Sequence, residues 1–373
     1  MKRSLLWVFL AALALACTSS RGPVAADPPA QTPERPPAPA EAVWPISPTP
    51  SHAAPRSITF PEDDGPHDAL TEWWYYNGHL TGAAGQGYGF ELVIFKRQSR
   101  GGWAGYAAHV AVTDHQQTSF QFAEDLTIPP PTAATPGSFD LTVGKIAARG
   151  AAGWDALRGA TEDYSLELEL RPLKPPALHG ETGYIGVGAS DLSYYYSRTR
   201  MAVTGMLRYR GDPVVVTGQA WMDHQWGDFS LQGGGGWDWF GVQLDDGREI
   251  MASVVRDGRG RIVLAYGTLV DASGETAHLS SERFRTRSSQ TWTSTVTGNV
   301  YPMGWTFEVP DHGIDLRLEP IIPGQEMVTT ASVNAVYWEG EVAVTGWTAG
   351  GPVKGLGYVE LTGYGASGEG SAR

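Results

Sequence analysis

Apolar and polar residues alternate along most of the chain after residue 60, as they do in β-strands that bury one face. The segment 164–171 shows the pattern most plainly, with tyrosine or leucine at every even position and mainly charged residues between them. The other segments of the first half that we predict to be strands are 73–80, 88–96, 103–113, 201–209 and 214–221. The last two are expected to pair as a hairpin across Gly211 and Asp212.

The pattern resumes after the glycine run 233–236, which we interpret as a hinge. The strands predicted beyond it are 237–247, 249–255, 261–270, 291–296, 305–309, 314–318, 333–347 and 353–361. Because these strands are evenly spaced and joined by short turns, the sequence predicts an all-β fold, an antiparallel sandwich or barrel. We expect two β domains, 60–232 and 233–366, and a flexible tail, 367–373.

Composition and charge narrow the choice of partner. The 373 residues include 47 glycines, 15 tyrosines and 14 tryptophans, which suits many short strands joined by tight turns. The net charge is -13, and the basic residues form no cluster in the sequence. Because nucleic-acid binding depends on clustered Lys and Arg, the sequence argues against nucleic acid as the main partner.

The N-terminus has the pattern of an exported lipoprotein. A positively charged start followed by a short apolar run makes residues 1–16 a predicted signal peptide. Residues 13–17 resemble a bacterial lipobox, so we expect Cys17, the only cysteine, to become a lipid anchor in the membrane. Thr18 after it favours the outer membrane over the inner one. The Pro- and Ala-rich segment 17–59 is predicted to be a disordered tether; the alternative is a cytoplasmic protein with an apolar leader.

The densest group of reactive side chains is WMDHQWGDF, residues 221–229, expected to form a loop or strand end. Asp223, His224 and Asp228 lie among its two tryptophans. Carboxylates and imidazoles held against aromatic rings have displaced pKa values, which is the usual condition of groups that transfer protons. The simpler interpretation is a polar corner in which these side chains bind backbone amides.

Several motifs together resemble one known family. They are TEWWYYNGHL, YGFELVIFKR, SYYYSRTRM, WMDHQWGDF, WDWFGVQLDDG, VYWEGEVAVTG and GYVELTGY, spread over about residues 60–364. Their order is similar to that of the AttH/CrtC family, lipocalin-like proteins that include carotenoid 1,2-hydratases. The resemblance implies two calycin-like β-barrels side by side. It also implies acid-base roles for Asp223, His224 and Trp226, with Trp237 and Asp238 as the nearest counterpart of a second family element.

Hydration of an isoprenoid C=C bond needs a partly desolvated acid, aromatic faces for the carbocation and one activated water. We therefore predict an apolar-ligand site where the two halves meet, without a cofactor. The catalytic candidates are Asp223, His224 and Asp238; the ligand-binding candidates are Trp73, Trp74, Trp221, Trp226, Trp237 and Trp239; the supporting candidates are Glu72, His79, His109 and Asp228.

Two alternatives stay open beside this hypothesis. A metal site is disfavoured, because the histidines are scattered in the sequence and form none of the close ligand pairs of known metal motifs. A non-catalytic function needs the same aromatic cavity: an anchored protein that binds or carries an apolar molecule. In that case the Asp-His cluster only closes the mouth of a barrel.

Overall fold

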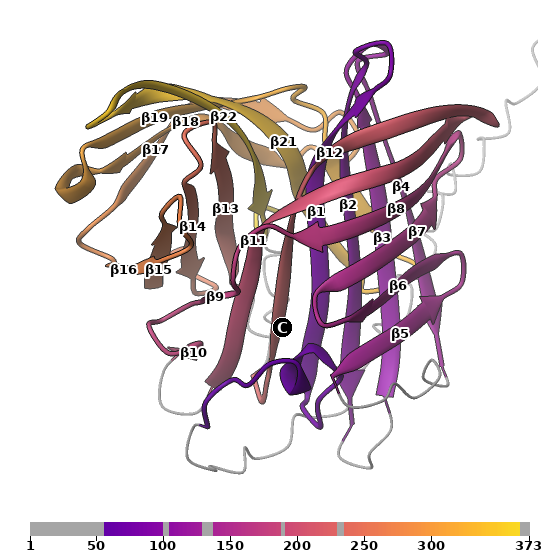
Figure 1. The fold of residues 1–373 in the computed structure, drawn as a ribbon, viewed down its shortest axis with the longest axis horizontal. Helices are drawn as coiled ribbons and strands as arrows, with labels where there is room; N and C mark the ends of the chain where they lie inside the picture. The colour runs from indigo at the N-terminus through magenta and orange to yellow at the C-terminus, as the bar shows by residue number, and fades with distance from the viewer. Residues whose placement is uncertain (1–55, 100–103, 129–136, 188–190, 230–234, 366–373) are drawn as a thin grey trace, which may run out of the picture. The chain divides into compact units, whose positions relative to one another are not determined.

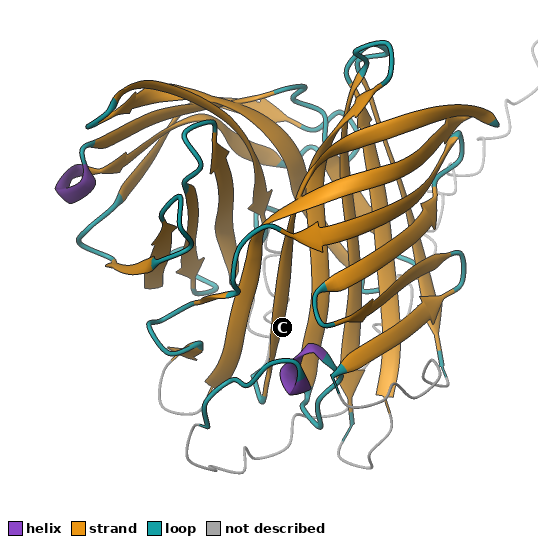
Figure 2. Ribbon diagram, viewed as in Figure 1, coloured by secondary structure: helices purple, strands orange, loops and turns teal. Residues whose placement is uncertain are grey.

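The computed structural model describes residues 56–99, 104–128, 137–187, 191–229 and 235–365, all within one compact unit of the chain. The predicted signal peptide, Cys17 and most of the predicted tether lie outside the described residues. The described chain is almost entirely β-strand, with two short 3-10 helices, η1 (Glu62–Asp64) and η2 (Pro310–His312) (Figure 2). Among these residues, no helix combines the length and the apolar character needed to cross a bilayer.

Two antiparallel sheets make up the fold (Figure 1). The first contains β1 (Thr71–Gly82), β2 (Gly87–Gln98), β3 (Ala104–Asp114), β4 (Ser119–Thr127), β5 (Ser138–Val143), β6 (Ile146–Ala151), β7 (Trp154–Ala160), β8 (Tyr164–Pro172), β9 (Ala177–Leu178), β10 (Tyr184–Val187), β11 (Asp191–Tyr209) and β12 (Asp212–Gly227). Its main order is β4-β3-β2-β1-β12-β11-β8-β7-β6-β5. Because β4 and β5 at the two ends contact each other, this sheet is a nearly closed barrel.

The second sheet contains β13 (Gly236–Leu244), β14 (Glu249–Arg256), β15 (Ile262–Val270), β16 (Thr276–Ser280), β17 (Arg285–Thr293), β18 (Val300–Val309), β19 (Ile314–Pro320), β20 (Glu326–Thr329), β21 (Ala335–Thr348) and β22 (Gly351–Leu361). Its main order is β16-β15-β14-β13-β22-β21-β19-β18-β17. The sheet curves around its own core in Figure 1. Its strands β13, β21 and β22 contact β11, β2 and β1 of the first sheet.

The strands where the sheets meet are buried on both faces. In β1, Trp74 and Tyr76 point into the core of the first sheet, while Trp73 and Tyr75 point toward the second sheet. The same alternation in β13 directs Phe240 into the core of the second sheet and Trp239 toward the first sheet. A third apolar cluster therefore lies between the sheets, and it surrounds the candidate site.

Most of the predicted strands are confirmed. One is wrong at its end: the segment predicted as 291–296 is the end of β17, which stops at Thr293, and Val296 lies in an exposed turn. Eight strands had no counterpart in the prediction: β4, β5, β6, β7, β9, β10, β16 and β20. That the two sheets are separate folding domains stays a prediction.

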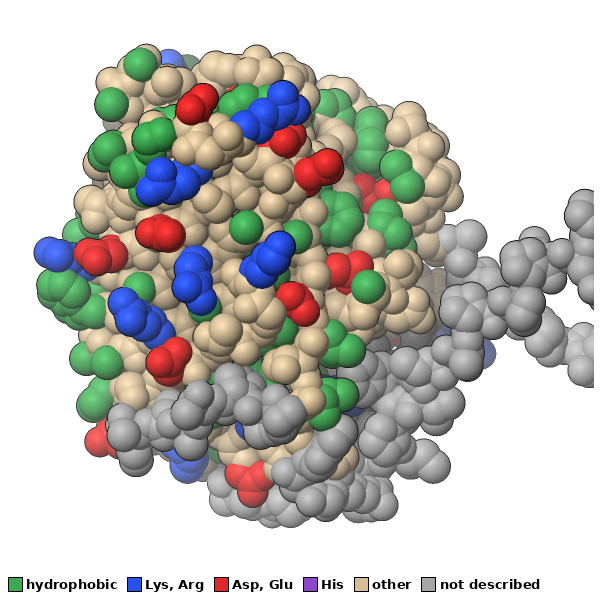
Figure 3. All heavy atoms as spheres, turned by 90° about the vertical axis from the view of Figure 1, so that its right-hand side faces the viewer, with side chains coloured by type: hydrophobic (Ala, Val, Ile, Leu, Met, Phe, Trp, Pro, Cys, Tyr) green, Lys and Arg blue, Asp and Glu red, His purple; other side chains and the backbone are tan. Residues whose placement is uncertain are grey.

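One face of the molecule is shown as spheres in Figure 3. Lys and Arg side chains alternate there with Asp and Glu, and apolar side chains are scattered between them. This face therefore presents side chains of both charges, interspersed.

Candidate functional site

Of the two predicted alternatives, a loop or a strand end, the structure shows the strand end: residues 221–227 are the last part of β12, a central strand paired with β1 on one side and β11 on the other. Consecutive side chains of a strand point to opposite faces. Trp221 and Asp223 consequently face the second sheet, whereas His224 and Trp226 face the interior of the first. The expectation that Asp223 and His224 act in one cluster is therefore corrected: they belong to two different sites.

A pocket of about 170 Å³ lies between the two sheets. We call it the inter-sheet pocket. It is lined by Trp73, Tyr75, Glu91, Val93, Phe95, Ile185, Ser193, Tyr195, Asp223, Gln225, Phe229, Trp237, Trp239, Ser253, Val255, Leu264, Tyr266, Tyr337, Glu339 and Glu360. The lining comes from both sheets, and most of it is apolar or aromatic. A ligand in the pocket would therefore be held by two sheets at once.

Asp223 is the pocket acid that the sequence predicted. Its carboxyl group accepts hydrogen bonds from Tyr195 Oη at 2.5 Å, from Trp221 Nε1 at 2.6 Å and from Ser197 Oγ. Burial raises the pKa of Asp223 to about 6, and these three donors oppose the rise. Ser197 in turn lies 2.6 Å from Nε2 of His179, which is fully buried. At neutral pH this geometry holds a carboxylate that can accept a proton near its own pKa.

Three further acids share the pocket: Glu91 on β2, Glu339 on β21 and Glu360 on β22. Burial, and then the charge of Glu360, raises the pKa of Glu91 well above its usual range. The pKa of Glu339 is raised in the same way by burial and by both other glutamates. Burial raises the pKa of Glu360 to about 7, against a 2.7 Å hydrogen bond from Trp237 Nε1. The raised pKa values favour the protonated forms of all three acids.

The carboxyl groups of Glu91 and Glu339 have few hydrogen-bond donors among the described residues. Tyr75 Oη donates to Oε1 of Glu339 at 2.7 Å, but Oε2 of Glu339 and both carboxyl oxygens of Glu91 have no hydrogen-bond partner among the described residues. Glu339 and Glu360 also stand directly opposite each other on neighbouring strands, where like charges are unfavourable. Such an arrangement costs stability, which is typical of groups kept for a function.

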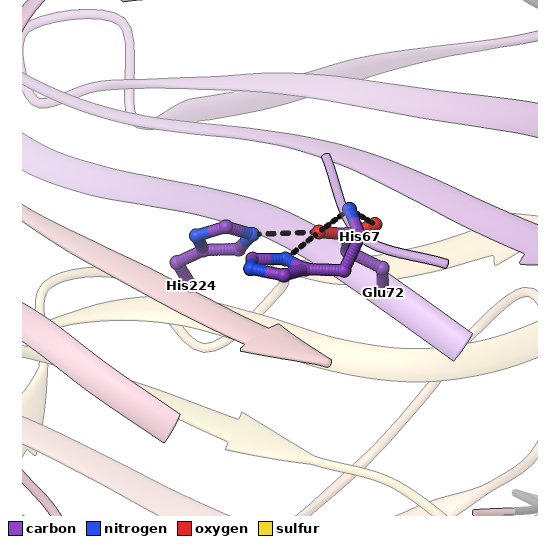
Figure 4. Close-up of side chains that lie close together, drawn as sticks. All are labelled: His67, Glu72 and His224. Carbon is purple, nitrogen blue, oxygen red and sulfur yellow. Dashed lines mark hydrogen bonds and ion pairs between the residues drawn. The ribbon is translucent and has the colours of Figure 1, made fainter. Parts of the chain in front are cut away.

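His224 takes part in a second cluster, inside the first sheet, with His67 and Glu72 (Figure 4). Oε1 of Glu72 lies 2.7 Å from Nδ1 of His67 and 3.0 Å from Nε2 of His224, and Lys96 Nζ lies 3.1 Å from Oε2. Burial favours a raised pKa for Glu72, but the hydrogen bonds from His224 and His67 and the charge of Lys96 lower it to about 2. The ring of Trp226 stacks on His67 with centroids 3.9 Å apart.

The histidines scattered in the sequence thus meet in the fold. One ligand atom from each of His67, Glu72 and His224 lies within 4.8 Å of the others, a donor set that zinc accepts. The contacts nevertheless describe an ion cluster that is already satisfied. His67 lies between two carboxyl groups, since its Nε2 is 3.0 Å from Asp63, and the Lys96 ammonium occupies the remaining oxygen of Glu72. We therefore interpret the cluster as structural.

The other predicted residues lie at several places in the fold. Trp73, Trp237 and Trp239 line the inter-sheet pocket, whereas Trp74 stacks on His224 in the first core. The remaining candidates are held by nearby groups: Asp238 pairs with Arg256 at 2.7 Å and with Tyr364, His79 hydrogen-bonds to Glu341 at 2.7 Å, His109 hydrogen-bonds to Tyr337 at 2.6 Å, and Asp228 accepts a hydrogen bond from the backbone N–H of Leu70. Of the predicted site residues, Asp223, Trp73, Trp237 and Trp239 therefore line the pocket, and the others are not part of its lining: Trp74, Trp221, His224, Trp226, Asp238, Glu72, His79, His109 and Asp228.

Sequence reasoning missed Glu91, Glu339 and Glu360, although each lies within a motif quoted for the family resemblance. The signal was present in the strands themselves. Residues 88–94 are apolar on one face, and the opposite face is also apolar except for Glu91. A single acid on a strand that is apolar on both faces points to a buried carboxyl group.

Fold and site together define an all-β protein with an aromatic, acid-lined small-molecule pocket between two antiparallel sheets. The chain belongs to the AttH-like family, whose model matches residues 51–364. A crystal structure of a candidate AttH protein from Nitrosomonas europaea is 33% identical, covers 84% of this chain and 98% of its own, and superposes with a TM-score of 0.76. No curated protein sequence matches the chain.

Two more distant structures share the fold. Kievitone hydratase from Nectria haematococca is 18% identical, with 85% of this chain and 96% of that chain covered and a TM-score of 0.67. CghA is 14% identical, with 79% and 88% covered and a TM-score of 0.52, and a second CghA structure contains Sch210972. At such identities the likeness concerns the fold alone.

Proposed function

We propose that this protein adds water to, or isomerises, a C=C bond of an apolar small molecule by acid-base catalysis in the inter-sheet pocket, without a cofactor. One observation supports the proposal above all others. Carboxyl groups in different environments line one aromatic pocket: the pKa of Asp223 is raised to about 6, that of Glu360 to about 7, and that of Glu339 is raised by burial and by its acidic neighbours. Pairs of carboxyls whose pKa values are pushed apart are the usual basis for assigning an acid and a base.

Glu339 is the proposed acid. Burial and the neighbouring glutamates raise its pKa, which favours its protonated form, and its Oε2 has no hydrogen-bond partner among the described residues. In the first step the O–H bond of Glu339 breaks, the proton forms a C–H bond with one alkene carbon, and a carbocation remains on the other. The indole faces of Trp73 and Trp239 and the resulting carboxylate stabilise this positive charge.

Asp223 is the proposed base. In hydration a water oxygen bonds to the carbocation, and one water proton passes to the Asp223 carboxylate. In isomerisation the same carboxylate removes a proton from a neighbouring carbon instead. Tyr195, Ser197 and Trp221 fix the orientation of this carboxylate. A proton then returns to Glu339 and completes the cycle; kievitone hydratase, which has this fold, is named for a hydration.

The test is turnover of a panel of terpenoids, unsaturated lipids and polyphenols, followed by mass spectrometry for a gain of water or a change of isomer. In Asp223→Asn and Glu339→Gln, we expect turnover to fall by about 10² to 10⁴ while ligand binding is kept, because each loses its proton-transfer group. His224→Gln, on the opposite face of β12, should lose far less. No turnover of any compound by the wild type would contradict the proposal.

A non-catalytic carrier is the alternative, and one observation favours it. Asp223 and His224, the pair linked with catalysis by the family resemblance, face different sites. A carrier should copurify with an apolar compound that mass spectrometry detects, and the substitutions at Asp223 and Glu339 should then change affinity alone.

We further propose that the protein is an exported lipoprotein anchored through Cys17, and that each sheet is a lipocalin-like barrel. Metabolic labelling with a radioactive fatty acid should label the wild type and leave Cys17→Ser unlabelled. Label in the variant, or none in the wild type, would overturn the anchor. An anchored protein would meet apolar compounds in or beside the membrane, which agrees with an apolar pocket.

A further inference from the structure

The described side chains of the inter-sheet pocket that can ionise at moderate pH are all acids, so any charge they carry is negative. Glu91, Asp223, Glu339 and Glu360 line it, and none of the described residues that line it is a Lys, Arg or His. Four other buried carboxylates have cations beside them: Glu72 has Lys96, Asp64 has Arg198, Glu249 has Lys174 and Arg200, and Glu341 has His79 and His115. The pocket acids therefore differ from these four in lacking a positive partner.

The unpartnered oxygens show where such a partner would lie. Glu91 is 1% exposed, and neither of its carboxyl oxygens has a hydrogen-bond partner among the described residues; the same holds for Oε2 of Glu339. A buried acceptor without a donor is rare in folded proteins and requires an explanation. A ligand that brings N–H groups to Glu91 and Glu339 supplies the missing donors.

The surrounding surface suits a positive charge on an apolar body. The indoles of Trp73, Trp237 and Trp239 line the pocket beside the acids, and aromatic faces attract cations, most strongly when water is excluded. Phe95, Phe229, Val255 and Leu264 complete an apolar wall. Aromatic rings together with carboxylates form the combination by which proteins recognise organic ammonium groups.

We infer that the inter-sheet pocket binds an organic cation: an apolar molecule with one ammonium group that donates to Glu91 and Glu339 and lies against the indoles. The inference rests on the proposed function only in taking this pocket as the ligand site, and it goes beyond that function: because a bound ammonium group ionises Glu339, the proposed acid, such a ligand occupies the pocket without being turned over. A carbocation formed during hydration and a stable amine share this chemistry, a positive centre beside indoles and carboxylates.

Binding of a cation should release protons. The ionisable groups that face the pocket acids are Tyr75 on β1, His109 on β3, Tyr195 on β11, Asp223 on β12, Tyr266 on β15, Tyr337 on β21 and Tyr358 on β22. All of these tyrosines have raised pKa values, and burial lowers the pKa of His109, so they stay uncharged near neutral pH. The carboxyl groups are then the groups that ionise when a cation enters.

The experiment is calorimetric titration of the purified protein with three probes of similar size: 4-phenylbutylammonium, 4-phenylbutanol and 5-phenylpentanoate. At pH 8 we expect the ammonium compound to bind about tenfold or more tightly than the alcohol, and the carboxylate most weakly. Its affinity should fall from pH 8 to pH 6, and the heat should depend on the buffer in the direction of proton release. An alcohol or carboxylate that binds as tightly as the ammonium compound would overturn the inference.

Glu91→Gln and Glu339→Gln test the assigned partners. Each should remove most of the preference for the ammonium compound over the alcohol, whereas Glu282→Gln, the same change at an exposed position, should keep it. If both pocket variants keep the full preference, the cation does not lie at these residues and the inference fails. Absence of turnover by the wild type would leave these affinities unchanged, so failure of the proposed function is recognised separately.

Discussion

Glu72 and Glu91 lie on neighbouring strands of one sheet, and both are almost fully buried, yet their environments are opposite. Glu72, on the inner face, accepts hydrogen bonds from His67, His224 and Lys96, and its pKa is lowered to about 2. Glu91, on the face toward the second sheet, has no donor among the described residues, and its pKa is raised. Burial alone therefore does not fix the state of a carboxyl group.

The two glutamates differ in whether the fold itself supplies hydrogen-bond donors and cations to the carboxyl group. The first sheet brings its own cations and N–H groups to Glu72, so that cluster is complete within the fold and stabilises it. The acids around Glu91 have aromatic neighbours and one another, and we propose that a ligand completes their environment. Two carboxyl clusters on neighbouring strands thus divide into one that the fold satisfies and one that we propose a ligand completes.

The largest effect on stability is expected from Glu72→Ala. Removing this carboxylate leaves Lys96 and His67 buried without it, and loss of one partner of a buried ion pair costs about 3 to 5 kcal/mol. Urea unfolding at pH 7, followed by tryptophan fluorescence, measures the change, with Glu282→Ala as the exposed control. A loss below about 1 kcal/mol would show that the cluster is not structural and would break the comparison.

The alternation of apolar and polar residues predicted most of the fold, because many strands have one face exposed to solvent. It left a loop and a strand end as alternatives at 221–227, because both faces are buried there and the contrast between apolar and polar positions disappears. Asp223 and His224 were therefore treated as one cluster, although their side chains point to opposite faces of β12. Which strand faces meet between the sheets depends on tertiary packing, so the convergence of Glu91, Glu339 and Glu360 could not be inferred from spacing alone.

Stability against pH should show the second effect. The pKa of Glu360 is about 7 in the folded protein against an ordinary 4.5, so between these values the folded state binds more protons than the unfolded state. Stability from this group is therefore present below pH 4.5 and is lost as pH rises to about 7, on the order of 3 kcal/mol. Glu72 acts in another window: its contribution is lost as pH falls from 4.5 to about 2.

Unfolding free energies measured from pH 4.5 to 8 in wild type and Glu360→Gln check this prediction. The variant cannot ionise at this position, so its stability should fall less with rising pH than that of the wild type. Parallel pH profiles would show that Glu360 ionises normally in the folded protein. In that case water reaches the Glu360 carboxyl group, and its environment differs less from that of Glu72.

The smallest effect gives the sharpest form of the comparison, because one substitution should act with opposite sign at two positions. At pH 8, Glu91→Gln removes a buried group that must either hold a proton or ionise beside other acids, and an amide keeps its shape. We expect a gain of about 1 to 2 kcal/mol in the unfolding free energy.

Glu72→Gln, the same change on the next strand, removes a carboxylate that three side chains stabilise and should lose stability at the same pH. A gain at both positions, or a loss at both, would mean that burial outweighs the donors after all. Opposite signs would instead separate a carboxyl group that the fold satisfies from one that awaits a ligand, because the two are equally buried and differ in their partners.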